Sequence, residues 1–131
     1  MVLVTVGSAI EKLFPMNINW NMRGDTYDDI IWLDKTIPKP SEDVINEAME
    51  ELKIEYAYEI LRKERNEKLA ACDYLFVNDY PHESEEIKNL WITYRQKLRD
   101  ITTSQIPVYN VDEIFRRSFI TGIDWPVQPS P

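Results

Sequence analysis

The chain has 131 residues, of which 44% are hydrophobic and 29% charged, and its formal net charge at pH 7 is −8. This length predicts a single domain with room for short arms, and the apolar content is too high for a disordered polymer. The acidic balance argues against general nucleic-acid binding because phosphates would repel it, although a local basic face could override that effect.

Cysteine usage and hydropathy point to a protein without a disulfide or a membrane span. Cys72 is the only cysteine, so no intramolecular disulfide is possible, and nothing resembles a cysteine-based zinc site. The opening MVLVTVGSAIEKLFP is charged too early for a signal peptide, and no run of 18 apolar residues exists. We therefore expect no leader and no membrane partner, and the chain could live in a reducing compartment.

The first 40 residues predict a β-rich or irregular arm. The run VLVTV, residues 2–6, has the composition of a short strand. Ser8 and Glu11 have the spacing of a capping box, which predicts one or two helical turns before Pro15.

Residues 18–32 predict a β-hairpin. Apolar and polar side chains alternate on both sides of Arg23-Gly24-Asp25, which supplies turn chemistry between the two strands. Trp20 and Trp32 would then lie on these strands. The same tripeptide occurs in cell-adhesion motifs, but the turn already accounts for it.

Residues 42–72 predict one long helix, because no glycine or proline interrupts them. Pro38 and Pro40 break regular structure just before it, and Ser41 has the position of an N-cap. Such a helix would span about 46 Å at 1.5 Å per residue. Its acidic start and basic end suit the helix dipole, and we expect so long a helix to bend or to reach beyond its own domain.

A second helix is predicted over residues 85–102, after an N-cap at Ser84. Apolar side chains recur along it at spacings of 4, 3, 4 and 3, which places one stripe on one face; they are Ile87, Trp91, Tyr94, Leu98 and Ile101. This stripe should pack against the first helix, so the two helices predict an antiparallel hairpin.

Two basic residues, Arg95 and Arg99, flank this stripe. One interpretation pairs them with acids of the first helix or of the connector, residues 73–79; the other makes them a partner contact. Asp100 would cap or pair locally.

A short third helix is predicted near residues 110–121, with Asn110 as its cap and Gly122 as its stop. Its apolar face would be Ile114, Phe115 and Phe119. The end, DWPVQPSP, predicts an extended proline-rich tail lying along a surface. Trp125 in this tail has two open interpretations, a docking peptide that inserts its indole into a partner and an intramolecular tie over the helical hairpin.

The predicted fold class is therefore mainly α: a long antiparallel helical hairpin, a short third helix, a small N-terminal β region and an extended C-terminal tail. The corresponding segments are residues 1–40, 41–103 and 104–131.

No catalytic, metal or cofactor constellation is evident in the sequence. His82 is the only histidine, and a metal site or a triad would need its other members from carboxylates and hydroxyls. The three glycines form no phosphate-binding loop. Acid pairs such as Glu50-Glu51 could hide a carboxylate-based hydrolase, but a solvated helix face explains them first.

Three stretches, RKERNEKLAACDYLFVNDYP, WITYRQKLRDIT and WPVQP, resemble the phage tail assembly chaperone-like domain family of tailed bacteriophages. The family pattern runs R-x-x-R-D, L-x-x-S-D-W, D-x-P, W-x-x-Y-R-Q-x-L-R-D-I and W-P-x-x-P, and the Y-R-Q-x-L-R-D block is its specific part. This chain departs from the pattern at Asn66, Cys72 and Tyr74. The positions that fit are Arg62, Arg65, Leu69, Asp73, Asp79, Pro81, Trp91, Tyr94, Arg95, Gln96, Leu98, Arg99, Asp100, Ile101, Trp125, Pro126 and Pro129.

The resemblance implies a non-enzymatic protein that assists tail or tail-fibre assembly by binding other phage structural proteins. It would act in the host cytoplasm and either remain in the virion as part of a larger assembly or leave before maturation. A small carboxylate-based hydrolase is the alternative from another class. Candidate partner-binding or motif residues are Trp20, Trp32, Asp73, Tyr74, Asp79, Trp91, Tyr94, Arg95, Leu98, Arg99, Asp100, Trp125 and Pro126.

Overall fold

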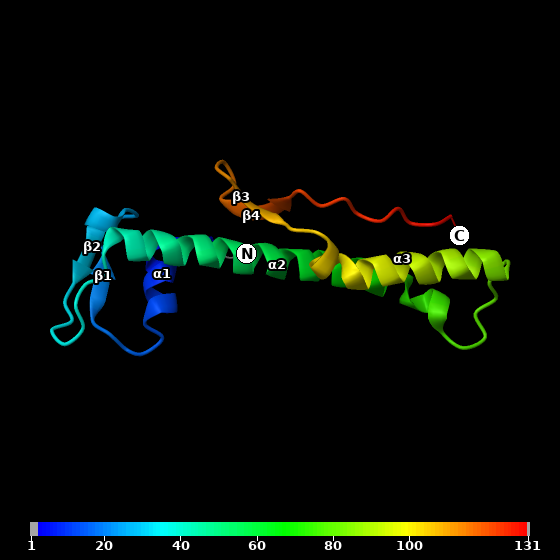
Figure 1. Ribbon diagram of the computed structural model, residues 1–131, viewed down its shortest axis with the longest axis horizontal. Coiled ribbons are helices and arrows are strands. Elements are labelled where there is room, and N and C mark those ends of the chain that lie inside the picture. The colour runs from blue at the N-terminus through cyan, green and yellow to red at the C-terminus, as the bar shows by residue number, and fades with distance from the viewer. Residues whose placement is uncertain (1–2, 131) are drawn as a thin grey trace. The chain divides into compact units, whose positions relative to one another are not determined.

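The computed structural model describes residues 3–130 and is mainly helical, as predicted (Figure 1). Packing divides these residues into two units. Unit 1 comprises residues 3–56 and 111–118, and unit 2 comprises residues 57–110 and 119–130. None of the helices in the described part of the chain is long and apolar enough to cross a membrane. The elements are α1 (Val6–Leu13), β1 (Trp20–Met22), β2 (Ile30–Trp32), α2 (Glu42–Cys72), α3 (Glu85–Ser104), β3 (Val108–Asp112) and β4 (Arg117–Thr121), with 3-10 turns at Tyr27–Asp29 and Asp73–Phe76.

Helix α1 begins with a capping box, one turn earlier than predicted. Thr5 is the N-cap: its Oγ1 accepts from the Ser8 amide at 3.1 Å, and the Ser8 Oγ accepts from the Thr5 amide at 2.7 Å. These reciprocal bonds satisfy amides that a helix start leaves open. The predicted strand is therefore wrong over residues 3–6, and residue 2 lies outside the described residues.

The predicted β-hairpin of unit 1 is confirmed. Strands β1 and β2 pair antiparallel, with Trp20 opposite Trp32. A Cβ added at Gly24 would collide with the Asp29 carboxylate, so a larger residue there would have to displace that side chain from its bonds to Thr26. The hairpin packs on the core of unit 1, whose buried members are Val6, Ala9, Ile10, Ile30, Ile45 and Ala48.

The two long helices begin where the sequence predicts. The Ser41 Oγ accepts from the Val44 amide at 3.3 Å before α2, and the Ser84 Oγ accepts from the Ile87 amide at 3.1 Å before α3. Helix α2 contributes residues to both units. Helix α3 ends at Ser104, two residues later than expected.

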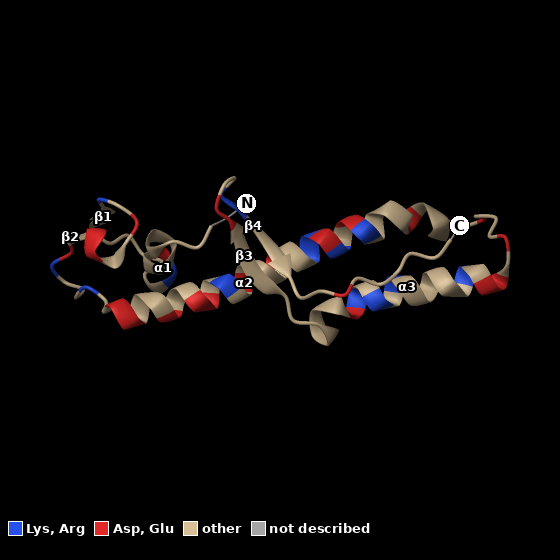
Figure 2. Ribbon diagram, turned by 90° about the horizontal axis from the view of Figure 1, so that it is seen from above, with Lys and Arg blue, Asp and Glu red and all other residues tan. Residues whose placement is uncertain are grey.

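Within unit 2, the second half of α2 and α3 form the predicted antiparallel pair. Arg65 Nη1 donates to the Arg99 carbonyl at 3.3 Å, and Arg95 Nη1 donates to the Leu69 carbonyl at 3.0 Å. A later residue of α2 therefore meets an earlier residue of α3, which defines opposite directions. Figures 1 and 2 show the same course.

The prediction of a short helix near residues 110–121 is wrong, because strands β3 and β4 form a hairpin there. Asp112 makes the turn: its Oδ1 accepts from the Ile114 and Phe115 amides at 2.9 and 3.2 Å, and its carbonyl accepts from the Arg116 amide at 2.8 Å. Asn110, expected as a helix cap, instead donates to the Thr121 Oγ1 at 2.8 Å across the strands.

The ends of this hairpin explain the misassigned signals. Ile114 and Phe115, expected on a helix face, lie at the tip and are 83% and 67% exposed. Gly122 has a positive φ of 82° and follows β4, so it ends a strand rather than a helix. Residues 123–130 form neither helix nor strand.

Asp34 orders the loop that follows β2. Its Oδ1 accepts from the Ile37 amide at 2.8 Å and from the Thr36 amide and hydroxyl, both at 2.9 Å. These bonds favour the charged carboxylate and lower the pKa of Asp34 to about 2. Trp32 Nε1 donates to the Ile37 carbonyl at 2.8 Å, which ties the same loop to the hairpin.

The Asp34→Asn substitution should destabilise the protein only where the carboxylate is charged. A lowered folded pKa stabilises the fold above the unfolded value of 3.8, and this contribution disappears as the pH falls toward about 2. We expect the melting temperature of the wild type to exceed that of the variant at pH 6, and the two to converge by about pH 2. A difference independent of pH would show that the charge of Asp34 contributes nothing.

Candidate partner-binding surface

Arg95 lies at the junction between α3 and the end of α2, within unit 2. Its Nη1 donates to the Leu69 carbonyl and to the Cys72 Sγ, both at 3.0 Å, and its Nη2 is 2.8 Å from the Asp73 Oδ1. The guanidinium carbon stands 4.9 Å from the centroid of the Phe76 ring. Only 12% of the Arg95 side chain is exposed, so nearly all of it takes part in packing and hydrogen bonding.

These contacts complete the C-terminus of α2. The last carbonyls of a helix have no partner within the helix and carry partial negative charge. The last turn of α2 contains no basic residue of its own, and Arg95 supplies one from α3. Burial opposes the charged form of Arg95, but the bonds to Cys72 and Asp73 outweigh it and raise its pKa.

The two basic residues of the motif differ in role. Arg95 pairs with Asp73 in the connector, as the first interpretation expects. The Arg99 guanidinium makes no ion pair among residues 3–130, so the expected pairing with an acid is wrong for Arg99, and its carbonyl accepts from Arg65 instead. Asp100 accepts locally from Gln96 Nε2 at 3.1 Å, as predicted. Arg99 and Asp100 therefore remain at the surface.

The apolar stripe of α3 is buried in the hairpin, as predicted. Trp91 is 2% exposed, Tyr94 6% and Leu98 not at all. The rings of Trp91 and Tyr94 meet edge-on at 5.7 Å. Burial, and to a lesser extent the neighbouring Cys72, raises the pKa of Tyr94, so its phenol stays neutral. These three side chains hold the fold, and very little of their surface is accessible to a partner.

The connector after α2 carries a small cluster of rings. Tyr80 lies edge-on to Tyr74 at 5.9 Å and to His82 at 4.8 Å. Tyr74 is 57% exposed, and Asp79 sits in a turn with a positive φ of 68°. Of the predicted site residues in the connector, Tyr74 and Asp79 are thus placed at the surface.

The tail is tied to the helical hairpin at its beginning. Gln105 Nε2 donates to the Asp124 carbonyl at 2.7 Å, and the Asp124 amide donates to Gln105 Oε1 at 2.6 Å. Trp125 then packs against the core that contains Trp91, with Lys68 Nζ 4.8 Å from its ring centroid. The structure thus shows Trp125 as an intramolecular tie.

Beyond Trp125, the tail and α3 form an open apolar hollow. Pro126 and Val127 line it from the tail, and Leu90 and Tyr94 line it from α3. Leu90 is 54% exposed and Val127 is 90% exposed. We call this the α3–tail surface.

Trp20 and Trp32 belong to unit 1 and pack against its core. Their residues face each other across β1 and β2, and the Trp32 ring centroid is 5.7 Å from that of Phe14. Both indoles therefore have structural roles within unit 1.

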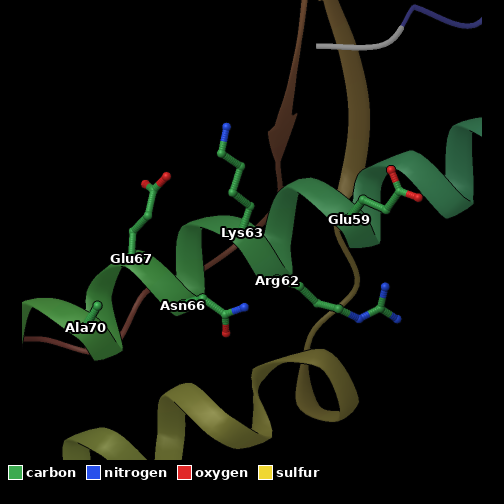
Figure 3. Close-up of a pocket in the computed structure, with 6 residues that line it drawn as sticks. All are labelled: Glu59, Arg62, Lys63, Asn66, Glu67 and Ala70. Carbon is green, nitrogen blue, oxygen red and sulfur yellow. The ribbon is translucent and has the colours of Figure 1, made fainter. Parts of the chain in front are cut away.

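A further hollow, shown in Figure 3, lies on α2 alone. All six residues that line it come from this helix, so it is an open face rather than an enclosed pocket. Its side chains mix both charges and show no convergence on one point; they are Glu59, Arg62, Lys63, Asn66, Glu67 and Ala70. Within residues 3–130, no group of three or more potential metal ligands comes together.

Sequence reasoning missed three residues that shape the α3–tail surface. Leu90 is apolar but lies off the 4-3-4-3 stripe, a signal that could have identified an exposed position. Gln105 and Lys68 gave no signal, because their contacts with the tail depend on the path of the chain.

Replacing Arg95 should cost more than replacing its acidic partner. We expect Arg95→Lys to lower the free energy of unfolding by about 2 kcal/mol, because lysine cannot reach both the Leu69 carbonyl and Asp73. Asp73→Asn should cost less than about 1 kcal/mol, since the Asp73 side chain is 62% exposed. Urea denaturation measures both, and equal losses would contradict a role centred on the helix end.

Gln105→Ala should loosen the tail without unfolding the hairpin. We expect the Asp124 amide to exchange with deuterium about five- to tenfold faster, because it loses its acceptor. Gln96→Ala is the matched control, since the Gln96 amide donates to Asp100 on the same helix. Unchanged exchange at Asp124, read by NMR, would show that another contact holds the tail.

Comparison with known proteins matches all of unit 2 but its first residue, together with residues 111–118 of unit 1. Residues 58–130, more than half of the chain, match the family model described as phage tail assembly chaperone protein. No curated protein and no solved structure matches the chain. The match begins one residue after the start of unit 2 and confirms the resemblance read from the sequence. The chain therefore belongs to the phage tail assembly chaperone family, which supports a chaperone role in tail assembly.

Proposed function

We propose that this protein is a non-enzymatic tail or tail-fibre protein of the assembly-chaperone type, which binds another phage structural protein and remains in the virion. It acts first in the host cytoplasm, where tails assemble. Family membership supports the assembly role. The observation that carries the partner-binding proposal is the apolar exposure of the α3–tail surface.

The α3–tail surface has the features of a docking site for a protein. The motif side chains Trp91 and Leu98 are buried inside the helical hairpin, so a partner cannot contact them. Leu90 and Val127 instead expose apolar surface beside Pro126, and contiguous exposed apolar surface marks interaction sites. Because Gln105 and Trp125 hold the tail in place, less ordering entropy is lost on binding.

A transient chaperone that uses the same surface but leaves before maturation is the second candidate. The family description, an assembly chaperone, favours it. The two candidates differ only in whether the complex with the tail protein persists in the finished particle.

Mass spectrometry of purified virions, quantified against the major capsid protein, separates the two candidates. We expect this protein at a fixed stoichiometry. Absence from virions, combined with a complex in infected cells, would replace the virion role with the transient one. Absence from both would contradict the proposed binding of a tail protein.

Substitutions on α3 test the α3–tail surface itself. Leu90→Asp should abolish co-purification with the tail protein, because burying a carboxylate in an apolar interface is unfavourable unless a cation or hydrogen-bond donor pairs with it. Ile92→Asp is the matched control: Ile92 is 44% exposed and lies about 200° around the helix from Leu90. Equal loss with both variants, or with neither, would place the contact elsewhere.

A further inference from the structure

Exposed apolar residues concentrate on the β3–β4 hairpin and just before it. Five of the large hydrophobic residues that the structure exposes fall within residues 106–119; they are Ile106, Val108, Ile114, Phe115 and Phe119. Ile114 and Phe115 are adjacent and occupy the tip of the hairpin, where Asp112 fixes the turn by accepting both of their amides. The tip therefore presents an apolar pair in a defined conformation.

Two cations follow this apolar pair. Arg116 and Arg117 make no ion pair among residues 3–130, although the Arg117 guanidinium stands 5.7 Å from the Phe115 ring centroid. Arg116 has a positive φ of 54°, a conformation in which glycine is the ordinary residue. This conformation is unfavourable for a residue with a side chain, and such residues cluster in turns and at functional sites. The tip thus combines apolar side chains with unpaired positive charge.

Negatively charged and apolar residues that complement the tip lie in the first half of α2, which belongs to unit 1 together with tip residues 111–118. Residues 42–59 contain seven acids and one base, and Figure 2 shows the acidic positions along this part of the helix. Val44, Glu47, Glu51 and Ile54 follow each other at spacings of 3, 4 and 3, so they share one face of the helix. Val44 is 41% exposed and Ile54 is 61% exposed. We call these four residues the acidic stripe.

The tip of a chain does not cover the acidic stripe of that chain, because both remain exposed. Glu47 makes no ion pair within residues 3–130, and Glu51 has only a 3.7 Å contact with Lys12 Nζ. From this charge and apolar complementarity we propose that two copies of this chain associate, with the hairpin tip of each copy docking on the acidic stripe of the other.

The reciprocal arrangement follows from symmetry. Both surfaces are present on every copy, so two equivalent contacts form a closed pair. Ile114 and Phe115 would cover Val44 and Ile54, while Arg116 and Arg117 would face Glu47 and Glu51. One tip alone is small compared with a stable protein interface, so the pair should be weak and concentration-dependent.

Sedimentation velocity of the full chain tests the association directly. Over about 1 to 200 μM we expect a monomer–dimer equilibrium that weakens as salt is raised. The double variant Ile114→Ala/Phe115→Ala should remain monomeric at every concentration with an unchanged melting temperature. A monomeric wild type, or association that survives this double variant, would overturn the proposal.

Arg116→Gly separates the backbone from the side chain. Glycine relieves the strained φ, so the melting temperature should stay equal or rise, whereas dimerisation should weaken about fivefold or more because a cation is lost. Unchanged dimerisation would show that Arg116 has no part in the contact.

A charge exchange identifies the contacting surfaces. Variant one carries Arg116→Glu and Arg117→Glu, and variant two carries Glu47→Lys and Glu51→Gln, which avoids a new cation beside Lys12. Each variant alone should be monomeric because its tip and stripe repel. Mixed together, they should form a heterodimer, since both reciprocal contacts become complementary. Failure of the mixture to associate, with both variants folded by circular dichroism, would overturn the pairing of these surfaces.

Discussion

The contact of Arg95 with the end of α2 is the constraint on which the rest of unit 2 depends. Helix α2 ends without a basic residue in its last turn, and the chain then enters the connector at Asp73. One guanidinium from α3 reaches the Leu69 carbonyl and the Asp73 carboxylate at once. This fork joins the two helices at one register, and a lysine could not reproduce it. In the same register Trp91 and Leu98 are buried.

Elements that depend on local signals were predictable from the sequence. The absence of glycine and proline over residues 42–72 and the serine before each long helix gave both helix starts, and the 4-3-4-3 stripe gave the buried face of α3. The pairing of Arg95 with the connector was expected, because antiparallel packing brings the middle of α3 near Asp73, but the same expectation failed for Arg99. The partner-binding role of the candidate residues stays a prediction.

The errors arose where one pattern satisfies two structures. Asn110, Ile114 and Phe119 fit a capped amphipathic helix, yet the same segment alternates as two short strands around Asp112. The Asp112 carboxylate favours the strands, because it accepts hydrogen bonds from two amides of the turn. The spacing of apolar residues does not reveal such side-chain-to-backbone bonds. The β-branched run before α1 likewise predicted a strand, whereas the capping box of Thr5 and Ser8 starts a helix at Val6. Gln105 was missed because its bonds to Asp124 join residues that only the path of the chain brings together.

The motif that identifies the family therefore encodes the hairpin more than the interface. Four motif side chains are buried or nearly so: Trp91, Tyr94, Arg95 and Leu98. They would affect the binding of a partner mainly through the shape of the helical hairpin. Under the proposed function, a partner would contact exposed side chains such as Leu90 and Val127, which lie outside the motif, and the exposed motif residues Arg99 and Asp100. Exposed residues of this scaffold can change without loss of the helical hairpin, because surface substitutions rarely disturb a packed core. A substitution of a buried motif residue such as Trp91 or Leu98 should then lower stability and binding together, whereas one at Leu90 on the α3–tail surface should lower binding alone.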